Sequence, residues 1–512
     1  MRAVHVHPCS SAAISGASSR LGQMPVTLIQ EQGVTRNSEA QAKSVELFTD
    51  LSMNIRCRPN PVDETQRRMD TVMRLLSART MAMDEIILAT GSSQPTLSRT
   101  IHELPGSVQL RVRGVRTPRY GVIRRLPGNI AGQQNVYRIT ATGSVLQAGL
   151  VSLLSGGETF MQMSKVGRLY DGLPPSMAFA APSGFLGRQT AHAVAADLQL
   201  PDSLRDWSDD HRAAYLLARG WNLAGDLVFG DAALAQLMEF RSAAPTAPGL
   251  KLDLYSQMTS NIKGSAVGSS AGGEQPKFLA YTEDRGHVLV KFAALGTRMA
   301  ELLRMENVAL DCLRGTGVPC ATTHFVEHTG YAYLEVERFD RAGAYGRVGM
   351  VSAGALDDEI FGQRDSWSQF ADRCEARRFL GTEQAHRFHI MAAYSELIGN
   401  SDRHFENISL LLDETGDVCD VAPAYDILPM KYAPIGAGVV PDLNPIAPKL
   451  GSIGARAGVW SAAGRAAQEF WTKCRDDERI GLSSSMRALA GVNLRVVQQF
   501  VMPLDASASM LR

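Results

Sequence analysis

The sequence predicts an α+β protein in which a two-lobed body follows a small N-terminal winged helix-turn-helix domain. Between residues 82 and 126, two short helical patterns separated by a glycine precede an arginine-rich hairpin. Segments with alternating apolar residues then predict strands at 278–292 and 331–339. A long apolar helix pattern follows at 382–397, and after it a cluster of Asp and Asn side chains surrounds a predicted hairpin.

Length and composition are those of a globular protein with two to four domains. The chain has 512 residues, of which 45% are hydrophobic and 20% charged. Its formal net charge of zero does not exclude a nucleic-acid partner, because a neutral total can contain a local basic patch. Seven cysteines without a CxxC pair indicate a reducing compartment. No stretch of about 18 apolar residues occurs, so we expect a cytoplasmic protein without a membrane partner.

Residues 1–62 are expected to be a disordered or extended start. They are rich in Ser, Ala and Gln, and no acidic residue precedes Glu31. Such composition is also typical of a targeting peptide, but the absence of an apolar central region argues against secretion. A start codon assigned too far upstream is a further explanation, with Met53 or Met69 as the alternative beginning.

Residues 63–128 predict the winged helix-turn-helix domain. Helical patterns occur at 68–77, 82–90 and 94–104. Gly91 ends the second pattern, and Ser93 stands before the third, whose Pro95 is favoured in the first turn of a helix. In the third helix the apolar residues face inward, which leaves polar side chains to face a groove. Two predicted strands, 108–115 and 120–126, follow as a wing.

The wing is strongly basic, with six arginines and no acidic residue between 107 and 128. This local charge predicts contact with the phosphate backbone of duplex DNA. The residues expected to contact DNA are Gln94, Thr96, Ser98, Arg99, Arg111, Arg113, Arg116 and Arg119. The alternatives are a solvated basic hairpin or a protein-docking face.

Residues 264–277 are rich in Gly and Ser and end at Lys277, a composition that lets backbone N–H groups approach phosphate oxygens. A flexible linker would look similar. The strand predicted at 287–292 follows and carries Lys291 after an alternating apolar run. This position is typical of a lysine that contacts the phosphates of ATP. The alternative is a charged residue that protects the edge of a sheet from pairing with another chain. The helix predicted at 299–313 offers Glu301 or Glu306 as its partner.

Three polar residues near the C-terminal end match the needs of phosphoryl transfer. Asp402 is followed five positions later by Asn407, and Asp426 comes after a predicted hairpin spanning 408–422. A carboxylate that orients a hydroxyl, together with an amide and a carboxylate that hold Mg²⁺, is the arrangement of a kinase centre. An acidic surface loop is the alternative explanation for the same residues.

Five ordered motifs together resemble the HipA family of bacterial serine/threonine kinase toxins. They read Ser-Ser-Ala-Gly-Gly-Glu-Gln-Pro-Lys, Leu-Val-Lys, Glu-Arg-Phe-Asp-Arg, Gly-Asn-Ser-Asp-Arg-His-Phe-Glu-Asn and Ala-Pro-Ala-Tyr-Asp-Ile-Leu. The similarity covers about residues 130–500. It is greatest to the YjjJ (HipH) branch, which places a DNA-binding-like segment ahead of the kinase. The resemblance implies a two-lobed protein-kinase-like body, divided into residues 129–340, with a β-rich subdomain and the N-lobe, and 341–512, the C-lobe.

The resemblance also implies roles for individual residues. Asp402 would be the catalytic base, and Asn407 and Asp426 would bind Mg²⁺. The ATP-binding residues would be Lys291, Gly272, Gly273, Lys277 and His404. Family members phosphorylate a serine of their own glycine-rich loop, and Ser270 or the adjacent Ser269 matches that position.

The implied partners are a protein substrate, such as an aminoacyl-tRNA synthetase or another translation factor, and a HipB-like antitoxin. The sequence departs from the family in two respects: the helix-turn-helix is fused to the kinase, and Glu274 stands where a small residue is common. Two other functions therefore stay open. One is a DNA-binding regulator that senses nucleotide without transferring phosphate, and the other is a small-molecule phosphotransferase. Metal binding by His386 and His389 lacks a completing zinc signature.

Overall fold

The structure is a computed structural model that describes residues 61–163, 165–264, 275–435 and 438–509. The expectations for residues 1–60 and for the glycine-rich loop at 265–274 lie outside the described residues. This loop includes Ser269, Ser270, Gly272, Gly273 and Glu274.

The first described elements are three helices and a small antiparallel sheet, with strand order β1-β3-β2. Their bounds are α1 Pro61–Ala78, β1 Met81–Ala82, α2 Met83–Thr90, α3 Gln94–Glu103, β2 Ser107–Leu110 and β3 Arg119–Val122. Val72, Ile86, Leu97 and Ile101 form a core between the helices. The predicted helices are confirmed, and Gly91 ends α2 with a φ of 67°. The predicted strand 108–115 is wrong beyond Leu110, because residues 111–118 form a loop.

A five-stranded antiparallel sheet follows, with strand order β10-β6-β7-β8-β9. Its strands are β6 Gln133–Ile139, β7 Val145–Leu153, β8 Glu158–Gln162, β9 Arg168–Asp171 and β10 Leu227–Phe229. The helices that accompany it are α4 Pro175–Ala180, α5 Gly184–Leu198, α6 Asp209–Arg219 and α7 Asp231–Phe240. Val136, Val151 and Phe229 of the sheet pack against Leu216 and Leu217 of α6 in one core.

The small sheet and the five-stranded sheet share a hydrophobic cluster. Leu110 from β2 packs with Leu154 and Phe160 of the β7–β8 region. The backbone nitrogen of Arg113 also donates to the carbonyl of Gly167, at 2.8 Å. A short connection with β4 Arg125–Leu126 and β5 Ile130–Ala131 joins the two sheets in the chain. The N-terminal elements are therefore attached through packing as well as through the chain.

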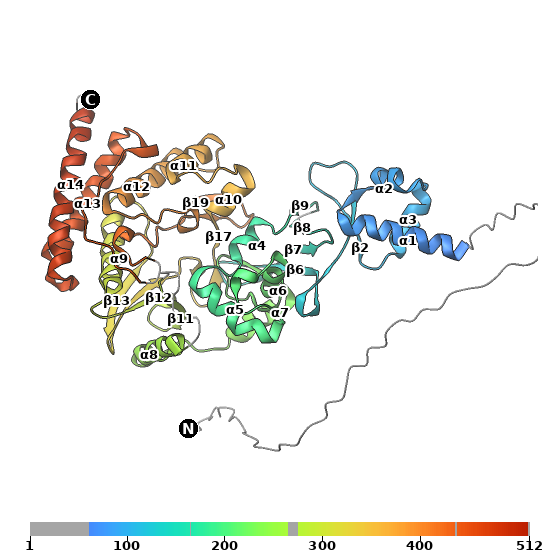
Figure 1. Cartoon of the computed structure of the whole chain (residues 1–512), viewed down its shortest axis with the longest axis horizontal. Coiled ribbons are helices and arrows are strands. Elements are labelled where there is room, and N and C mark those ends of the chain that lie inside the picture. Colours follow the sequence, from blue (N-terminus) through green and yellow to red (C-terminus); the bar gives the residue numbers. More distant parts are fainter. Residues whose placement is uncertain (1–60, 164, 265–274, 436–437, 510–512) are drawn as a thin grey trace, which may run out of the picture. The chain divides into compact units, whose positions relative to one another are not determined.

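A third antiparallel sheet has the order β11-β12-β14-β13, and Figure 1 labels its strands β11, β12 and β13. Its strands are β11 Lys277–Thr282, β12 Gly286–Ala294, β13 Thr323–His328 and β14 Tyr331–Glu337. Helix α9, Arg298–Arg314, contacts β12 and β14, and α8, Pro248–Gly264, contacts β11. The strands predicted at 278–281, 287–292 and 331–339 and the helix predicted at 299–313 are confirmed, although β14 ends at Glu337.

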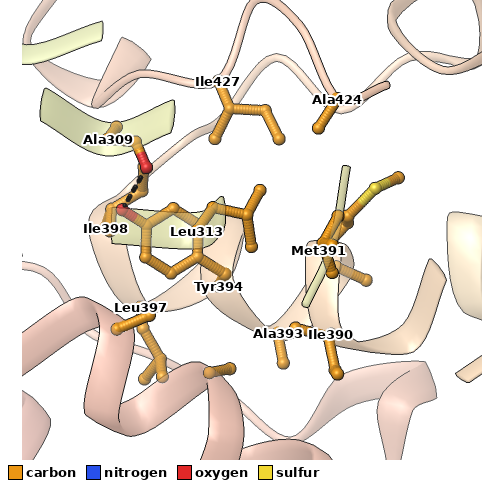
Figure 2. Packing of buried hydrophobic residues seen from close by; sticks show 14 of the residues in the cluster. Ala309, Leu313, Ile390, Met391, Ala393, Tyr394, Leu397, Ile398, Ala424 and Ile427 are labelled. Carbon is orange, nitrogen blue, oxygen red and sulfur yellow. Dashed lines mark hydrogen bonds between the residues drawn. The ribbon is translucent and has the colours of Figure 1, made fainter. Parts of the chain in front are cut away.

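The remaining residues are mainly helical. The helices are α10 Ala353–Ile360, α11 Trp367–Ala376, α12 Thr382–Ile398, α13 Ala457–Asp476 and α14 Ser484–Ser509. Helix α12 is apolar on nearly all sides, because α9, α11 and α13 surround it. Figure 2 shows its Tyr394, whose hydroxyl donates to the carbonyl of Ala309 at 2.9 Å. None of the helices in the described ranges combines the length and apolar character needed to cross a membrane.

Short strands complete this part of the chain. They are β15 Arg341–Ala342, β16 Gly346–Arg347, β17 Gly349–Ser352, β18 Ser409–Leu412 and β19 Val418–Val421. Strands β18 and β19 form the predicted hairpin, and β17 pairs with the outer side of β18. Asn407 precedes this hairpin and Asp426 follows it. Because the chain turns back within the hairpin, both residues line the same cavity.

Candidate functional site

Lys291 is the centre of a buried ionic cluster. On β12 its neighbours Val290 and Phe292 are buried, and Lys291 itself is 3% exposed. Its ammonium nitrogen lies 2.7 and 2.8 Å from the two carboxylate oxygens of Glu306 on α9. The same nitrogen lies 2.6 Å from Oδ1 of Asp426. Of the two glutamates predicted as partners, Glu306 is therefore the one that pairs with Lys291.

Glu301, the other predicted partner, contacts a different part of the protein. Its carboxylate accepts a hydrogen bond from the backbone nitrogen of Ser483 at 2.8 Å and lies 3.3 Å from the guanidinium of Arg298. The difference follows from helix geometry, since residues five positions apart on a helix point in different directions.

The charges in the cluster change one another's pKa. Burial alone would raise the pKa of Asp426, but the ammonium groups of Lys291 and Lys277 lower it to about 2. Burial raises the pKa of Glu306, even though Lys291 opposes this. Burial opposes the charge of Lys291, yet Asp426 and Glu306 hold its pKa above the ordinary value. The lysine thus stays cationic and keeps Asp426 anionic.

Two loops hold the polar residues that follow α12. Gly399 ends the helix with a φ of 78°, and the next loop carries Asp402 and Asn407. The side-chain nitrogen of Asn407 donates to the backbone carbonyl of Asp402 at 2.9 Å. Asp426 follows β19 and has a φ of 54°, a left-handed conformation that is strained for a residue other than glycine.

A cavity of about 620 Å³ contains most of the predicted site residues. Lys277, Lys291, Asn407 and Asp426 line it together with Glu306. Its apolar wall comes from strands β11, β12 and β14 and from the segments after β14 and β19; the residues are Leu279, Leu289, Val336, Phe339 and Tyr425. Residues of α4, α5 and α6 and of the loop after α6 also line this cavity.

Asp402 and His404 line a different cavity, of about 980 Å³. His404 Nδ1 lies 3.3 Å from the carboxylate of Glu406, and its Nε2 lies 3.6 Å from Asp402. The hydrogen bond to Glu406 raises the pKa of His404, while burial opposes this and Asp402 adds to it. The structure thus brings four of the predicted residues into one cavity and places Asp402 and His404 beside it.

A buried network that the sequence did not reveal adjoins the 620 Å³ cavity. Asp340 accepts hydrogen bonds from Arg338, from Arg341 and from the backbone nitrogen of Gly225, at 2.7, 2.7 and 3.0 Å. Both arginines also donate to the side-chain oxygen of Asn222, each at 2.9 Å. The Glu-Arg-Phe-Asp-Arg motif was visible in the sequence, but nothing pointed to its partners at 222–225.

The residues predicted to contact DNA occupy two places. Gln94, Ser98 and Arg99 are exposed on α3, whereas Thr96 is half-buried and hydrogen-bonds to Ser93. Three of the predicted wing arginines are exposed on the loop between β2 and β3, and these are Arg111, Arg113 and Arg116.

Arg119, on β3, differs from the other predicted arginines. Its guanidinium donates to the carbonyl of Thr80 at 2.6 Å and lies 3.3 Å from the carboxylate of Glu85. These contacts join β3 to the end of α1 and to α2. The guanidinium of Arg119 is therefore largely engaged in contacts within the fold.

Comparison with known proteins places these features in a family. Residues 269–489 match the HipA-like C-terminal domain, and residues 130–238 match the middle domain of YjjJ-like toxins. The chain is 31% identical over 410 residues to Toxin YjjJ of Escherichia coli K12, which covers 78% of this chain and 90% of that protein. The chain therefore belongs to the YjjJ-like toxins, which carry a HipA-like C-terminal domain.

Two solved structures are more distantly similar. One is HipA from the HipA, HipB and operator DNA complex of Shewanella oneidensis, at 14% identity and a TM-score of 0.42. It covers 73% of this chain and 97% of its own. The other is the proinflammatory kinase CtkA of Helicobacter pylori, at 12% identity and a TM-score of 0.33, covering 46% of this chain and 94% of its own.

Proposed function

We propose that the protein is an ATP- and Mg²⁺-dependent kinase that phosphorylates serine or threonine hydroxyls of a protein. The observation that carries this proposal is the buried contact of Lys291 with Glu306 and Asp426, on a cavity that Asn407 also lines. In kinases a strand lysine paired with a helix glutamate contacts the phosphates, and an Asn and an Asp hold the metal.

The cavity suits a nucleotide in volume and chemistry. Its 620 Å³ lies within the range of small-molecule sites, and its apolar residues Leu279, Leu289 and Phe339 offer contacts for a purine. Lys291 and Lys277 supply positive charge for the phosphates. Just before Lys277 in the chain, Gly272 and Gly273 are proposed to cover the nucleotide, and Ser270 or Ser269 to be the site of autophosphorylation.

The oxygen atoms at the site fit Mg²⁺. Asn407 uses its side-chain nitrogen to bind Asp402, which leaves its Oδ1 as a ligand atom, and Asp426 supplies a carboxylate kept ionised by Lys291. A bound Mg²⁺ would neutralise phosphate charge during transfer. Asp402 lies next to Asn407 and would orient the attacking hydroxyl and accept its proton.

Radiolabelled ATP tests this proposal with purified full-length protein. The Asp402→Asn and Asp426→Asn variants should lose phosphate transfer by about 10²-fold or more, because each removes a carboxylate that acts on the reacting groups. Asp311→Asn on the surface of α9 is the matched control, since its carboxylate is 53% exposed and pairs with Arg314, away from the cavity. Wild-type transfer in either active-site variant would refute the assignment. Salt-sensitive DNA binding without any phosphoprotein would favour the nucleotide-sensing regulator.

We further infer that residues 63–128 form a winged helix-turn-helix domain that binds duplex DNA. Support comes from the order of α1–α3 before a small sheet, and from exposed polar residues on α3 and exposed arginines on the following loop. Replacing Arg111, Arg113 and Arg116 by Ala should weaken DNA binding and reduce the salt slope by about 0.9 for each lost phosphate contact. Unchanged slopes in a fluorescence titration would contradict this. A HipB-like antitoxin and a translation factor as substrate are proposed from family membership, with the cytoplasm as location.

A further inference from the structure

The 980 Å³ cavity beside Asp402 lies apart from the residues that we propose to hold the nucleotide and Mg²⁺, although His404, which the family resemblance assigns to ATP, lines it. Neither Asn407 nor Asp426 lines it. Its walls come from the turn before α11 and its first residues at 364–368, from Glu396 on α12, and from the segment 447–453. The two cavities meet at one pair of residues, where Asn407 donates to the carbonyl of Asp402 at 2.9 Å. A hydroxyl of a ligand in the larger cavity can therefore approach Asp402 close to the point where the two cavities meet.

Most charged side chains on this cavity are paired with neighbours. Arg403 lies 2.7 Å from Glu396. Arg364 pairs with Glu406 and lies 2.6 Å from Asp358, and Asp365 lies 2.5 Å from Arg373. Each of these arginines is therefore engaged by at least one carboxylate, so none of them is left as a free cation for an occupant.

Lys449 is the exception among the described residues of the cavity wall. Its side chain is exposed and has no ion-pair partner there, while its backbone nitrogen donates to Glu396 at 2.9 Å. This backbone contact fixes the position of the lysine on the rim. An unpaired cation thus shares the cavity with Asp402.

We propose that this cavity is the acceptor groove of the kinase. It holds an extended polypeptide segment whose serine or threonine hydroxyl lies at Asp402 and whose acidic side chain pairs with Lys449. The proposal rests on the proposed kinase function. Size favours a polypeptide, since the groove is larger than the 620 Å³ nucleotide cavity and lies at the upper limit for small molecules. Ser401 and Ser452 also line it and offer hydroxyls to a peptide backbone, whereas the hydroxyl of Ser366 caps α11.

The transfer step is balanced within this arrangement. The bond between the γ-phosphorus and the bridging oxygen of ATP breaks, and a bond from the acceptor hydroxyl oxygen to that phosphorus forms. ADP leaves with the electron pair, and the hydroxyl proton passes to the Asp402 carboxylate. Products are a phosphopeptide and ADP, with no further reactant.

A peptide series tests the groove with the full-length protein and radiolabelled ATP. Each peptide has one serine, and a single Glu occupies each of the six neighbouring positions in turn; a parallel series has Lys instead. At the best position, the Glu peptide should exceed its Lys counterpart in kcat/KM by about two- to fivefold, as expected for a partly exposed charge pair. Lys449→Glu should reverse this preference, mainly through KM.

Lys431→Glu is the matched control, because Lys431 is an exposed lysine that does not line the groove. It should keep the wild-type preference. If Lys449→Glu keeps the wild-type preference for the Glu peptide, the groove assignment is wrong. It is also wrong if the protein phosphorylates itself but phosphorylates no peptide. Free serine accepting phosphate as fast as the peptides overturns the polypeptide occupant. Absence of transfer to any protein or peptide instead refutes the kinase function itself.

Discussion

At the scale of single residues, Lys291 shows how one side chain determines the state of a site. The lysine is buried between two carboxylates, one from a helix and one from a loop more than a hundred residues later in the chain. The sequence located Lys291 from its strand pattern and offered two glutamates as partners. Only the packing of α9 against β12 decides for Glu306, because partner choice depends on how the helix is rotated about its axis.

Removing this lysine should destabilise the fold as well as stop catalysis. In Lys291→Met, Glu306 and Asp426 lose their common partner, and breaking a buried ion pair costs about 3–5 kcal/mol. Urea unfolding at pH 7 measures the free energy of unfolding. The double variant Lys291→Met with Glu306→Leu should recover part of the loss, because it removes one buried charge. A double variant no more stable than the single one would contradict this explanation.

At the scale of secondary-structure elements, local patterns predicted several regular elements but not the strands β6–β10 or the helices α13 and α14. The β18–β19 hairpin and the helices α3, α9 and α12 follow from the spacing of their apolar residues. The loop at 111–118 was missed because its apolar Val112 and Val115 alternate with arginines as in a strand. In the structure Val112 instead pairs with Gly167, a partner that no local pattern reveals.

The first residues of β12 carry a group that should make stability depend on pH. Burial, together with the charges of Arg341 and Arg338, lowers the pKa of His287 to about 4, although its hydrogen bond to the Ala344 carbonyl opposes this. An unfolded histidine has a pKa of about 6.5. The unfolded state therefore binds the proton first, so the stability contributed by neutral His287 is complete above about pH 6.5 and is lost as the pH falls towards 4.

Urea unfolding at pH 7 and pH 5 measures this effect. Wild-type protein should lose more stability between these pH values than His287→Gln, which has no proton to bind there. Gln keeps an N–H group that can donate to the carbonyl of Ala344, as the ring nitrogen does at 3.1 Å. Equal losses in both proteins would show that other groups cause the acid sensitivity.

At the scale of the whole molecule, the site is built from more of the chain than the motifs suggested. The 620 Å³ cavity is lined by strands β11, β12 and β14 and by residues between 179 and 224, within the part that matches the middle domain of YjjJ-like toxins. The sequence identified Lys277, Lys291, Asn407 and Asp426, because each belongs to a short local motif. It did not identify Asn222 or Gly225, since Asn222 acts through Arg338 and Gly225 through Asp340, each more than a hundred positions away.

The Asp340 network should link the stability of these two parts to ATP binding. Asp340→Asn would leave Arg338 and Arg341 without their carboxylate, although each is at most 12% exposed, at a cost of about 3–5 kcal/mol. KM for ATP should also rise, because Arg338, Asp340 and Asn222 line the cavity. Calorimetric unfolding and initial rates measure both effects. Asp476→Asn is the control, because this acid is 55% exposed, and it should change neither the stability nor the KM for ATP. A wild-type KM in Asp340→Asn would show that the network does not affect ATP binding.

The hydrophobic cluster between β2 and the β7–β8 region has a practical consequence for separating the parts of this protein. Cutting the chain after residue 128 would remove Leu110, and the apolar side chains of Leu154 and Phe160 would face water. Arg124 would be lost as well, and with it the guanidinium that lies 2.6 Å from Asp210. A fragment that begins at residue 129 would thus expose an apolar face and tend to aggregate during expression. Shortened versions should begin near residue 61, so that both sheets are kept.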